Sequence, residues 1–197
     1  MIEDCTAIIL AGGDSQRMGS DKANLLLDGQ SLLQRVTATM RLVFPQVIIS
    51  VRQLRPEIGL LQVCDDPSSA GPLAGLVSGL RHITTPWAFA VACDMPFVEL
   101  SVIERLAQRR EGCQAVVPVV QGYPQPLAAF YARNCLEVMR AHLDSGGKNS
   151  LQAILEKLDV CYVDEAEMRA ADPGLRSFFD LDTAQDVARA ECDEGIR

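Results

Sequence analysis

The sequence has few of the residues that build metal and disulfide frameworks. Its 197 residues include only two histidines, His82 and His142, and both fall in predicted helices. The seven cysteines are scattered, odd in number and form no C-x-x-C pair. This pattern argues against a zinc or disulfide scaffold and predicts free thiols in a reducing cytoplasm.

Long apolar runs are also absent. No run approaches the ~18 residues that a membrane span needs, and residues 1–20 lack a signal-peptide pattern. The composition, 48% hydrophobic and 22% charged, is ordinary for a protein with a buried core. The length fits one domain, typically ~100–200 residues. We therefore expect residues 1–197 to form a single cytoplasmic domain with no membrane contact.

Positive charge shows no concentration of the kind that binds nucleic acid. The net charge is −8, and residues 159–197 hold 11 acidic and 4 basic residues. Residues 1–158 are nearly balanced, with 15 acidic and 14 basic residues. Without a basic stripe or an aromatic platform, nucleic acid is not an expected partner. The acidic carboxyl-terminal part is most simply a solvated surface.

Strand-like and helix-like segments alternate along the chain. Apolar runs predict strands over 6–10, 46–51, 60–64, 87–93, 114–120, 126–131 and 158–163. Apolar spacing and capping residues predict helices over 31–44, 72–82, 102–110, 134–144 and 150–158, with a last helix from Thr183. Ser31, Asn134 and a Ser101–Glu104 capping box are the expected amino-terminal caps.

Such alternation predicts an α/β fold with a mostly parallel sheet covered by helices on both faces. Ligands in these folds bind at the carboxyl ends of the strands. Three polar clusters follow predicted strands there: residues 12–22, residues 65–71 and Asp94. The topology therefore predicts one shared site.

The first cluster is a glycine-rich loop, in which Gly12 and Gly13 are followed by Arg17 and Lys22. Glycines let backbone N–H groups approach an anion, and the two cations can neutralise a polyphosphate. The spacing matches neither the P-loop nor the dinucleotide fingerprint. We interpret the loop as a nucleotide site. The alternative is a structural turn with solvent-facing cations.

Asp94 immediately follows the predicted strand 87–93. A carboxylate at the end of a buried strand is costly unless a positive charge compensates it. Mg²⁺ binds one or two carboxylates plus phosphate oxygens, so Asp94 is the candidate metal ligand. A turn aspartate before Pro96 is the alternative.

Two further loops carry candidate residues. Asp65 or Asp66 could accept hydrogen bonds from a ribose or base, although Asp66-Pro67 also fits a plain turn. Lys148, in a glycine-rich loop, could bind an acceptor phosphate or simply lie on the surface.

Taken together, these segments resemble the molybdenum cofactor guanylyltransferases. The likeness rests on L-A-G-G-x-S-x-R-M-G-x-x-K, G-P-L-A-G-L, C-D-M-P and Gln125-Pro126-Leu127 in order along most of the chain. It implies a Rossmann-like three-layer nucleotidyltransferase fold of the nucleotide-diphospho-sugar transferase type. It also implies transfer of GMP from GTP to molybdopterin-bound molybdenum cofactor, with Mg²⁺ and release of pyrophosphate.

The resemblance, together with the charge and loop position of the residues, predicts roles for individual residues. Arg17, Lys22 and Asp94 would be catalytic, and Asp94 would bind Mg²⁺. The nucleotide would contact Leu10, Ala11, Gly12, Gly13, Lys22, Asp65 and Asp94. The acceptor would contact Gln125 and Lys148. Proteins that deliver or accept the molybdenum cofactor would be transient partners.

The sequence departs from the family near its carboxyl end, where Asp180 and Asp182 stand in place of the usual asparagines. Acidic groups there disfavour an anionic acceptor unless they are protonated or metal-bound.

Three alternatives to this function stay open. A cytidylyltransferase for the same cofactor usually reads L-A-A-G, so Gly12 favours a purine. Another NTP:phosphate nucleotidyltransferase is a second alternative. A nucleotide-binding partner protein without catalysis is the third, and the Arg17, Lys22 and Asp94 set argues against it.

Overall fold

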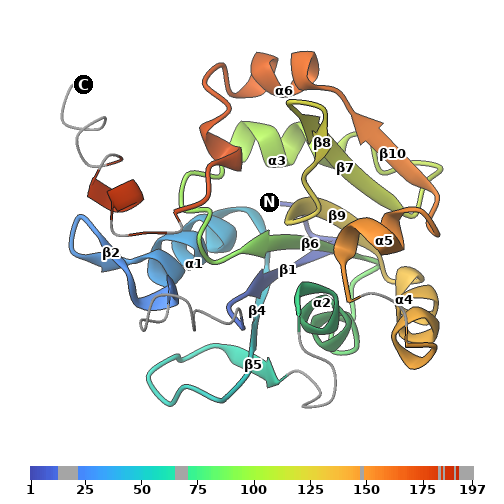
Figure 1. The fold of residues 1–197 in the computed structure, drawn as a ribbon, viewed down its shortest axis with the longest axis horizontal. Helices are drawn as coiled ribbons and strands as arrows, with labels where there is room; N and C mark the ends of the chain where they lie inside the picture. The colour runs from blue at the N-terminus through green and yellow to red at the C-terminus, as the bar shows by residue number, and fades with distance from the viewer. Residues whose placement is uncertain are drawn as a thin grey trace.

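A computed structural model describes residues 1–12, 22–64, 71–146, 149–181, 183, 185–188 and 190, and only the backbone of Lys22. Within these residues an eight-stranded sheet has the order β10-β7-β9-β6-β1-β4-β5, with β8 paired to β7 (Figure 1). Its strands are β1 (Cys5–Leu10), β4 (Gln46–Val51), β5 (Leu61–Cys64), β6 (Trp87–Ala92), β7 (Ala115–Val120), β8 (Tyr123–Pro124), β9 (Ala128–Ala132) and β10 (Val160–Val163). A separate small hairpin joins β2 (Leu26–Leu27) to β3 (Gln30–Ser31).

The sheet is mostly parallel, which confirms the prediction. β1 pairs in parallel with β4 and β6, and β4–β5 and β7–β10 are parallel pairs as well. β9 is antiparallel to both β6 and β7, and the short strand β8 is antiparallel to β7. Residues 121–127, which separate β7 from β9, are too few for the crossover that a parallel pair requires.

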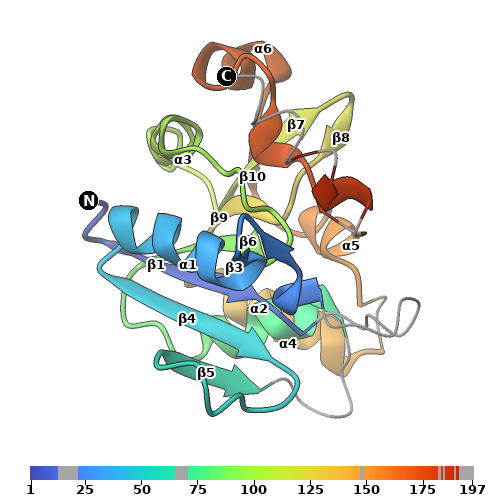
Figure 2. The same ribbon diagram turned by 90° about the vertical axis from the view of Figure 1, so that its left-hand side faces the viewer.

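Helices cover both faces of the sheet, as the three-layer prediction requires (Figures 1 and 2). One core cluster contains side chains of α1 (Leu32–Val43), α3 (Leu100–Ala107) and α6 (Glu165–Ala171). The cluster on the other face contains side chains of α2 (Pro72–Leu80), α4 (Cys135–Asp144) and α5 (Leu151–Leu155). Among the described residues, no helix is both long and apolar enough to span a membrane.

The predicted cap at Ser31 is confirmed, whereas the predicted cap at Ser101 is wrong. The Gln34 N–H donates to Ser31 Oγ at 3.2 Å, and the Ser31 N–H donates to the Gln34 side chain at 2.9 Å. These reciprocal bonds start α1 at Leu32. Ser101 caps nothing, because its hydroxyl donates to the Ala171 carbonyl at 2.9 Å and α3 already begins at Leu100.

The other helices differ from the predictions in their caps or in their length. Asn134 precedes α4 as expected but makes no side-chain cap, and α5 is shorter than the predicted helix 150–158. The helix α6, which the sequence did not suggest, begins where the Asp164 carboxylate accepts from the Glu167 N–H at 2.9 Å. Thr183 caps the last helical residues, accepting from the Asp186 N–H at 3.1 Å.

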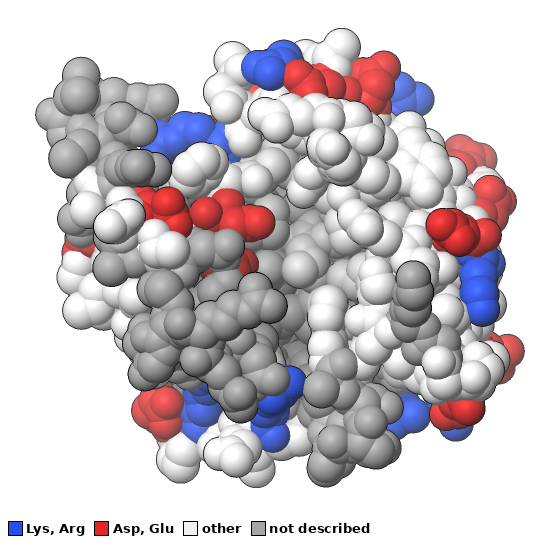
Figure 3. All heavy atoms as spheres, in the orientation of Figure 1, with Lys and Arg blue, Asp and Glu red and all other residues white. Residues whose placement is uncertain are grey.

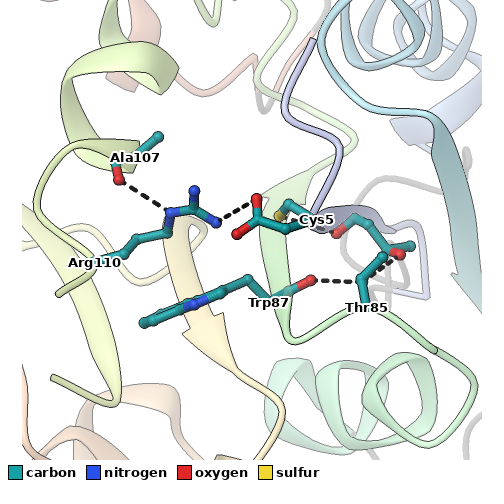
Figure 4. Close-up of polar contacts among 7 residues, drawn as sticks. Cys5, Thr85, Trp87, Ala107 and Arg110 are labelled. Atoms are coloured by element: carbon teal, nitrogen blue, oxygen red, sulfur yellow. Dashed lines mark hydrogen bonds and ion pairs between the residues drawn. The ribbon is translucent and has the colours of Figure 1, made fainter. Parts of the chain in front are cut away.

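Arg110 contacts several segments at the amino-terminal edge of the sheet (Figure 4). Its guanidinium donates to the Ala107 carbonyl and to Asp4 Oδ1, both at 3.0 Å. It also lies 5.6 and 5.4 Å from the ring centroids of Trp87 and Phe130. Cation–π contacts of this kind stabilise by about 0.5–2 kcal/mol each. These contacts hold the amino-terminal edge, which leaves the carboxyl edge for ligands.

The six cysteines that the structure describes are free thiols, as predicted. Burial raises the pKa of Cys5, and it raises that of Cys135 to about 12. Because the thiolate is the reactive form, these two residues act as small core side chains.

Gly79 lets α2 approach the central strand closely. A Cβ at this position would lie 2.6 Å from Ile8 Cγ2, on a fully buried side chain of β1. Overpacking costs about 1–3 kcal/mol, which exceeds the ~1 kcal/mol that alanine gains over glycine in a helix. Gly79→Ala is therefore expected to lower the free energy of unfolding by up to about 2 kcal/mol in urea titrations. Gly59→Ala, which meets nothing within 4 Å, is the matched control, and an equal loss there would contradict this account.

Candidate functional site

Four parallel strands end at the same edge of the sheet, and the predicted clusters follow three of them in the chain. Leu10 of β1 is in register with Ser50 of β4 and with Ala92 of β6. On β4, Val51 is in register with Cys64 of β5. The segments that leave β1, β4, β5 and β6 therefore emerge at neighbouring positions, as the topology predicted.

The first predicted cluster begins as a continuation of β1. The Ala11 N–H donates to the Ser50 carbonyl at 2.8 Å, so β1 and β4 stay paired past Leu10. Ala11 is buried and Gly12 half-buried, which leaves the backbone of Gly12 partly accessible at the sheet edge. This placement agrees with a role for Leu10, Ala11 and Gly12 in holding a ligand through the backbone.

Of the two cationic residues in this cluster, the structure describes only the backbone of Lys22. Gly13 and Arg17 lie outside the described residues, and so does the side chain of Lys22. The backbone of Lys22 opens a 3₁₀ turn, η2 (Lys22–Asn24), which packs against α1. Ala23, which directly follows this cluster, is buried in this packing.

Asp94 lies next to this continuation of β1. The Cys93 N–H donates to the Leu10 carbonyl at 3.1 Å, which extends the β1–β6 pairing by one residue. Asp94 follows in a turn in which the Met95 N–H donates to the Ala92 carbonyl at 3.3 Å. Asp94 is half-buried, whereas Cys93 and Met95 on either side are buried. The structure thus brings Asp94 beside Gly12.

A segment distant in sequence reaches the same point. The Leu181 N–H donates to the backbone carbonyl of Asp94 at 2.8 Å, and the Leu181 side chain is fully buried. Asp180, which immediately precedes it, is exposed. The departure from the family at Asp180 therefore lies beside Asp94, while Asp182 is outside the described residues.

The approach of this segment is fixed by buried polar contacts that the sequence did not reveal. Buried Asp172 accepts from the Ser177 N–H at 2.7 Å, and Ser177 Oγ accepts from the Glu99 N–H at 3.0 Å. These bonds hold the turn η3 (Arg176–Phe178) against the start of α3. The role of Asp172 could not be predicted from the sequence, because its partners depend on the turn itself and on tertiary packing.

Gln125 lies near the same edge because β9 runs antiparallel to β6. Val91 is in register with Ala128, and the Ala92 N–H donates to the Leu127 carbonyl at 3.3 Å. Gln125 precedes these residues, half-buried, and its amide donates to the Tyr123 carbonyl at 3.2 Å.

The residue after Gln125 is also held in place. The Tyr131 hydroxyl donates to the Pro126 carbonyl at 2.9 Å. Burial raises the pKa of Tyr131, so the phenol stays protonated and able to donate. The turn that presents Gln125 is therefore fixed from within the core.

Gly71 and Asn149 meet at the amino end of α2. Gly71 has φ +123°, and a Cβ there would lie 3.2 Å from Cγ of Asn149. Asn149 is therefore packed against Gly71, and Asp65, Asp66 and Lys148 lie near these two residues only in sequence. Those three side chains lie outside the described residues.

Gly71→Ala is expected to destabilise the protein by about 2–3 kcal/mol, because it combines a backbone strain of 1–3 kcal/mol with the Asn149 contact. Thermal unfolding would measure the loss. Gly122→Ala is a suitable comparison, because Gly122 also has positive φ but meets nothing within 4 Å. Equal losses in the two variants would show that the Asn149 contact contributes nothing.

The face that Figure 1 turns to the viewer is hollowed near its centre, in the region where β1 and β6 are labelled (Figure 3). Acidic side chains gather along one side of this hollow. A cleft flanked by carboxylates at the carboxyl edge suits a ligand that arrives with cations.

Comparison with known proteins agrees with this arrangement. The family model for the MobA-like NTP transferase domain matches residues 7–161. A molybdenum cofactor guanylyltransferase from Desulfosudis oleivorans is 36% identical over 190 residues, which cover 94% of each chain. A probable molybdenum cofactor guanylyltransferase from Pelotomaculum thermopropionicum is 34% identical over 94% of this chain and 91% of its own.

Solved structures show the same fold. Molybdopterin-guanine dinucleotide biosynthesis protein A from Archaeoglobus fulgidus superposes with a TM-score of 0.85 at 28% identity, covering 98% of this chain and all of its own. The 2-C-methyl-D-erythritol 4-phosphate cytidylyltransferase from Thermus thermophilus shares the fold at a TM-score of 0.71 and 16% identity, over 95% and 98% of the two chains. By its family model, its relatives and its fold, the chain belongs to the molybdenum cofactor guanylyltransferase family, within the MobA-like NTP transferases.

Proposed function

We propose that this protein transfers GMP from GTP to molybdopterin-bound molybdenum cofactor in the cytoplasm. The observation that carries the proposal is the placement of Asp94 beside the Leu10–Gly12 backbone at the carboxyl edge of the sheet. The names of the relatives support the choice of donor and acceptor. The free thiols support a reducing compartment.

The reaction exchanges one phosphoanhydride bond for another. A terminal phosphate oxygen of molybdopterin attacks the α-phosphorus of GTP, a new P–O bond forms, and the bond to the β-phosphate breaks. Pyrophosphate carries away the electron pair. No general base is required, because the attacking phosphate is already ionised near neutral pH.

The donor set at Asp94 fits Mg²⁺. This ion usually takes one or two protein carboxylates and fills its other positions with phosphate oxygens and water. Asp94 offers a half-exposed carboxylate at the sheet edge and would hold the ion. When bound, Mg²⁺ would polarise the phosphate oxygens and offset the charge that develops during transfer.

The remaining roles in donor binding follow from charge and position. Lys22 and Arg17 would bind the phosphates and stabilise the departing pyrophosphate, because positioned cations are the main source of catalysis in phosphate transfers. The backbone of Leu10, Ala11, Gly12 and Gly13 would orient the nucleotide. Asp65 would accept hydrogen bonds from the nucleoside, with Asp66 as the alternative.

The acceptor would bind on the side of the site near β9. Gln125 lies there, past the carboxyl end of β6, and would donate or accept hydrogen bonds through its amide. Lys148, which precedes Asn149 in the chain, would bind the acceptor phosphate. Asp180 and Asp182 would tolerate that phosphate only when protonated or bound to a cation.

A pyrophosphate-release assay with GTP or CTP, with and without molybdenum cofactor, tests the proposal. We expect release that depends on Mg²⁺ and on the acceptor, with GTP preferred. Faster release from CTP would identify a cytidylyltransferase. Binding of GTP without release would identify a nucleotide-binding partner protein, and both results would overturn the proposal.

A further inference from the structure

The hairpin that joins β7 to β8 leaves the sheet at the same height as Asp94. Phe130 of β9 is in register with Phe89 of β6 on one side and with Val116 of β7 on the other. Asp94 follows Phe89 by five residues, and Gln121 follows Val116 by five residues. β6 and β7 run in the same direction and are separated by β9, so they lie about 10 Å apart. The hairpin therefore borders the proposed site on its acceptor side.

The turn of this hairpin has a backbone conformation that is unfavourable for one of its residues. Val120 pairs with Tyr123, which leaves Gln121 and Gly122 as a two-residue turn. Their φ angles are +52° and +80°, as the tight turns of β-hairpins often require. Gly122 adopts such an angle freely, whereas a residue with a side chain adopts it at a cost in free energy. A contact from outside the hairpin at Gln121 would therefore stabilise the turn.

Glu165, in the first turn of α6, makes this contact. The Gln121 N–H donates to Glu165 Oε2 at 2.6 Å, and Arg169 Nε donates to the other carboxylate oxygen at 2.8 Å. The Gln121 N–H, and Arg169 to a smaller extent, lower the pKa of Glu165, so its carboxylate is ionised at neutral pH. Hydrogen bonds to an ionised acceptor are shorter and stronger than those between neutral groups. The bond is thus suited to hold the turn.

The helix that carries Glu165 is itself fixed to the rest of the fold. β10 leads into α6 and pairs in parallel with β7. Arg109 Nε, just past the end of α3, donates to Glu167 of α6 at 3.0 Å. At the other end of α6, the Ala171 carbonyl accepts from the Ser101 hydroxyl at 2.9 Å. Glu165 therefore reaches the hairpin from a helix whose position is set by β7 and α3 (Figure 1).

The shape of the hairpin determines how it presents Gln125. The Gln125 N–H, immediately after β8, donates to the Pro118 carbonyl of β7 at 2.8 Å, which fixes the base of the hairpin. The Gln125 side chain donates to the Tyr123 carbonyl, inside the hairpin, at 3.2 Å. The orientation of this amide therefore depends on the base of the hairpin and on the turn that Glu165 contacts.

We propose that Glu165 is a positioning residue for the acceptor substrate. It holds the turn between β7 and β8, and the hairpin then holds the Gln125 amide at the carboxyl edge of the sheet. This inference rests on the proposed function, which assigns Gln125 to acceptor binding. Glu165 acts through the backbone of Gln121, and the donor half of the site lies on other strands. Loss of Glu165 should therefore weaken binding of the acceptor and leave binding of GTP unchanged.

Hydrogen–deuterium exchange tests the contact without any substrate. Glu165→Ala is expected to speed exchange of the backbone amides of residues 119–123 about 2–10-fold, because the turn loses one hydrogen bond. Glu137→Ala is the matched control, because it removes a glutamate from the first turn of α4, on the other face of the sheet. We expect no change in these amides in the control. Unchanged exchange in Glu165→Ala would overturn the proposal.

Transfer kinetics test the role in acceptor binding. Glu165→Ala is expected to raise the KM for molybdenum cofactor about 2–10-fold, with the KM for GTP and kcat within about twofold of the wild type. Glu165→Gln keeps an oxygen that can accept from the Gln121 N–H, so its KM should lie between the two. An equal rise in both KM values, or a lower melting temperature with no change in KM, would make the role of Glu165 merely structural.

A second substitution separates the turn from the carboxylate. Asn-Gly is the most favourable sequence for a two-residue hairpin turn, so Gln121→Asn should hold the turn without Glu165. Combined with Glu165→Ala, it is expected to return the KM for the cofactor to within about twofold of the wild type. A KM that stays raised would show that Glu165 acts by another route. A wild type without transfer would overturn the proposed function, and the exchange rates would still decide whether Glu165 holds the turn.

Discussion

Replacement of Asp94 by alanine is expected to abolish GMP transfer, lowering kcat by about 10³-fold or more. The reason is that the variant would lose the proposed Mg²⁺ ligand while keeping the backbone contact at this position. The Leu181 N–H binds the carbonyl of Asp94, not its side chain, so the carboxyl-terminal segment should stay in place. Pyrophosphate release under saturating GTP would measure the loss.

Controls separate this effect from misfolding. Glu104→Gln removes an exposed carboxylate from α3 and is expected to leave kcat and the melting temperature unchanged. Asp94→Asn should bind Mg²⁺ better than Asp94→Ala but more weakly than the wild type. It should therefore reach its half-maximal rate at a higher Mg²⁺ concentration than the wild type. A near-normal rate in Asp94→Ala would remove Asp94 from the mechanism.

Gly12→Ala is expected to change the choice of nucleotide. In the proposed complex, glycine at this position would leave room beside the base, and the pattern that the resemblance gives for the cytidylyltransferases has alanine there. A methyl group in a fitted pocket changes discrimination by about 10–200-fold, so kcat/KM for GTP should fall within that range while kcat/KM for CTP changes little. Parallel assays with the two nucleotides would measure the ratio.

The position of Gly12 makes this test specific. Among the described residues, the last backbone bond from this strand to β4 is that of Ala11, whose N–H donates to the Ser50 carbonyl. A methyl group on the next residue should therefore disturb the ligand more than the sheet. If GTP and CTP lost activity equally, Gly12 would have a structural role and would not select the base. Gly59→Ala provides the background value for a glycine substitution at an open position.

The sheet and half of the site could be predicted from the sequence because they depend on local patterns. Apolar runs predicted β1, β4 and β6. Because these strands are parallel, Gly12 and Asp94, which follow two of them, were expected at the same edge of the sheet. Ser31 was a predictable cap because its partner, Gln34, lies three residues away.

The contacts that could not be predicted join residues far apart in the chain. Ser101 has the local pattern of a cap, yet its hydroxyl binds the Ala171 carbonyl, 70 residues away. The same holds for Leu181, whose N–H reaches Asp94 from the far end of the chain. No spacing rule contains such a pair, because it exists only after the helices have packed.

The reversed strand β9 has a further consequence for how this enzyme family can diversify. The parallel strands β1, β4, β5 and β6 carry the donor half of the proposed site, and β9 enters the same edge from the opposite direction with Gln125. Insertions between β7 and β9 can therefore reshape the acceptor half without shifting the register of the donor half. One sheet can in this way keep the donor half of the site unchanged while the acceptor half adapts to another substrate.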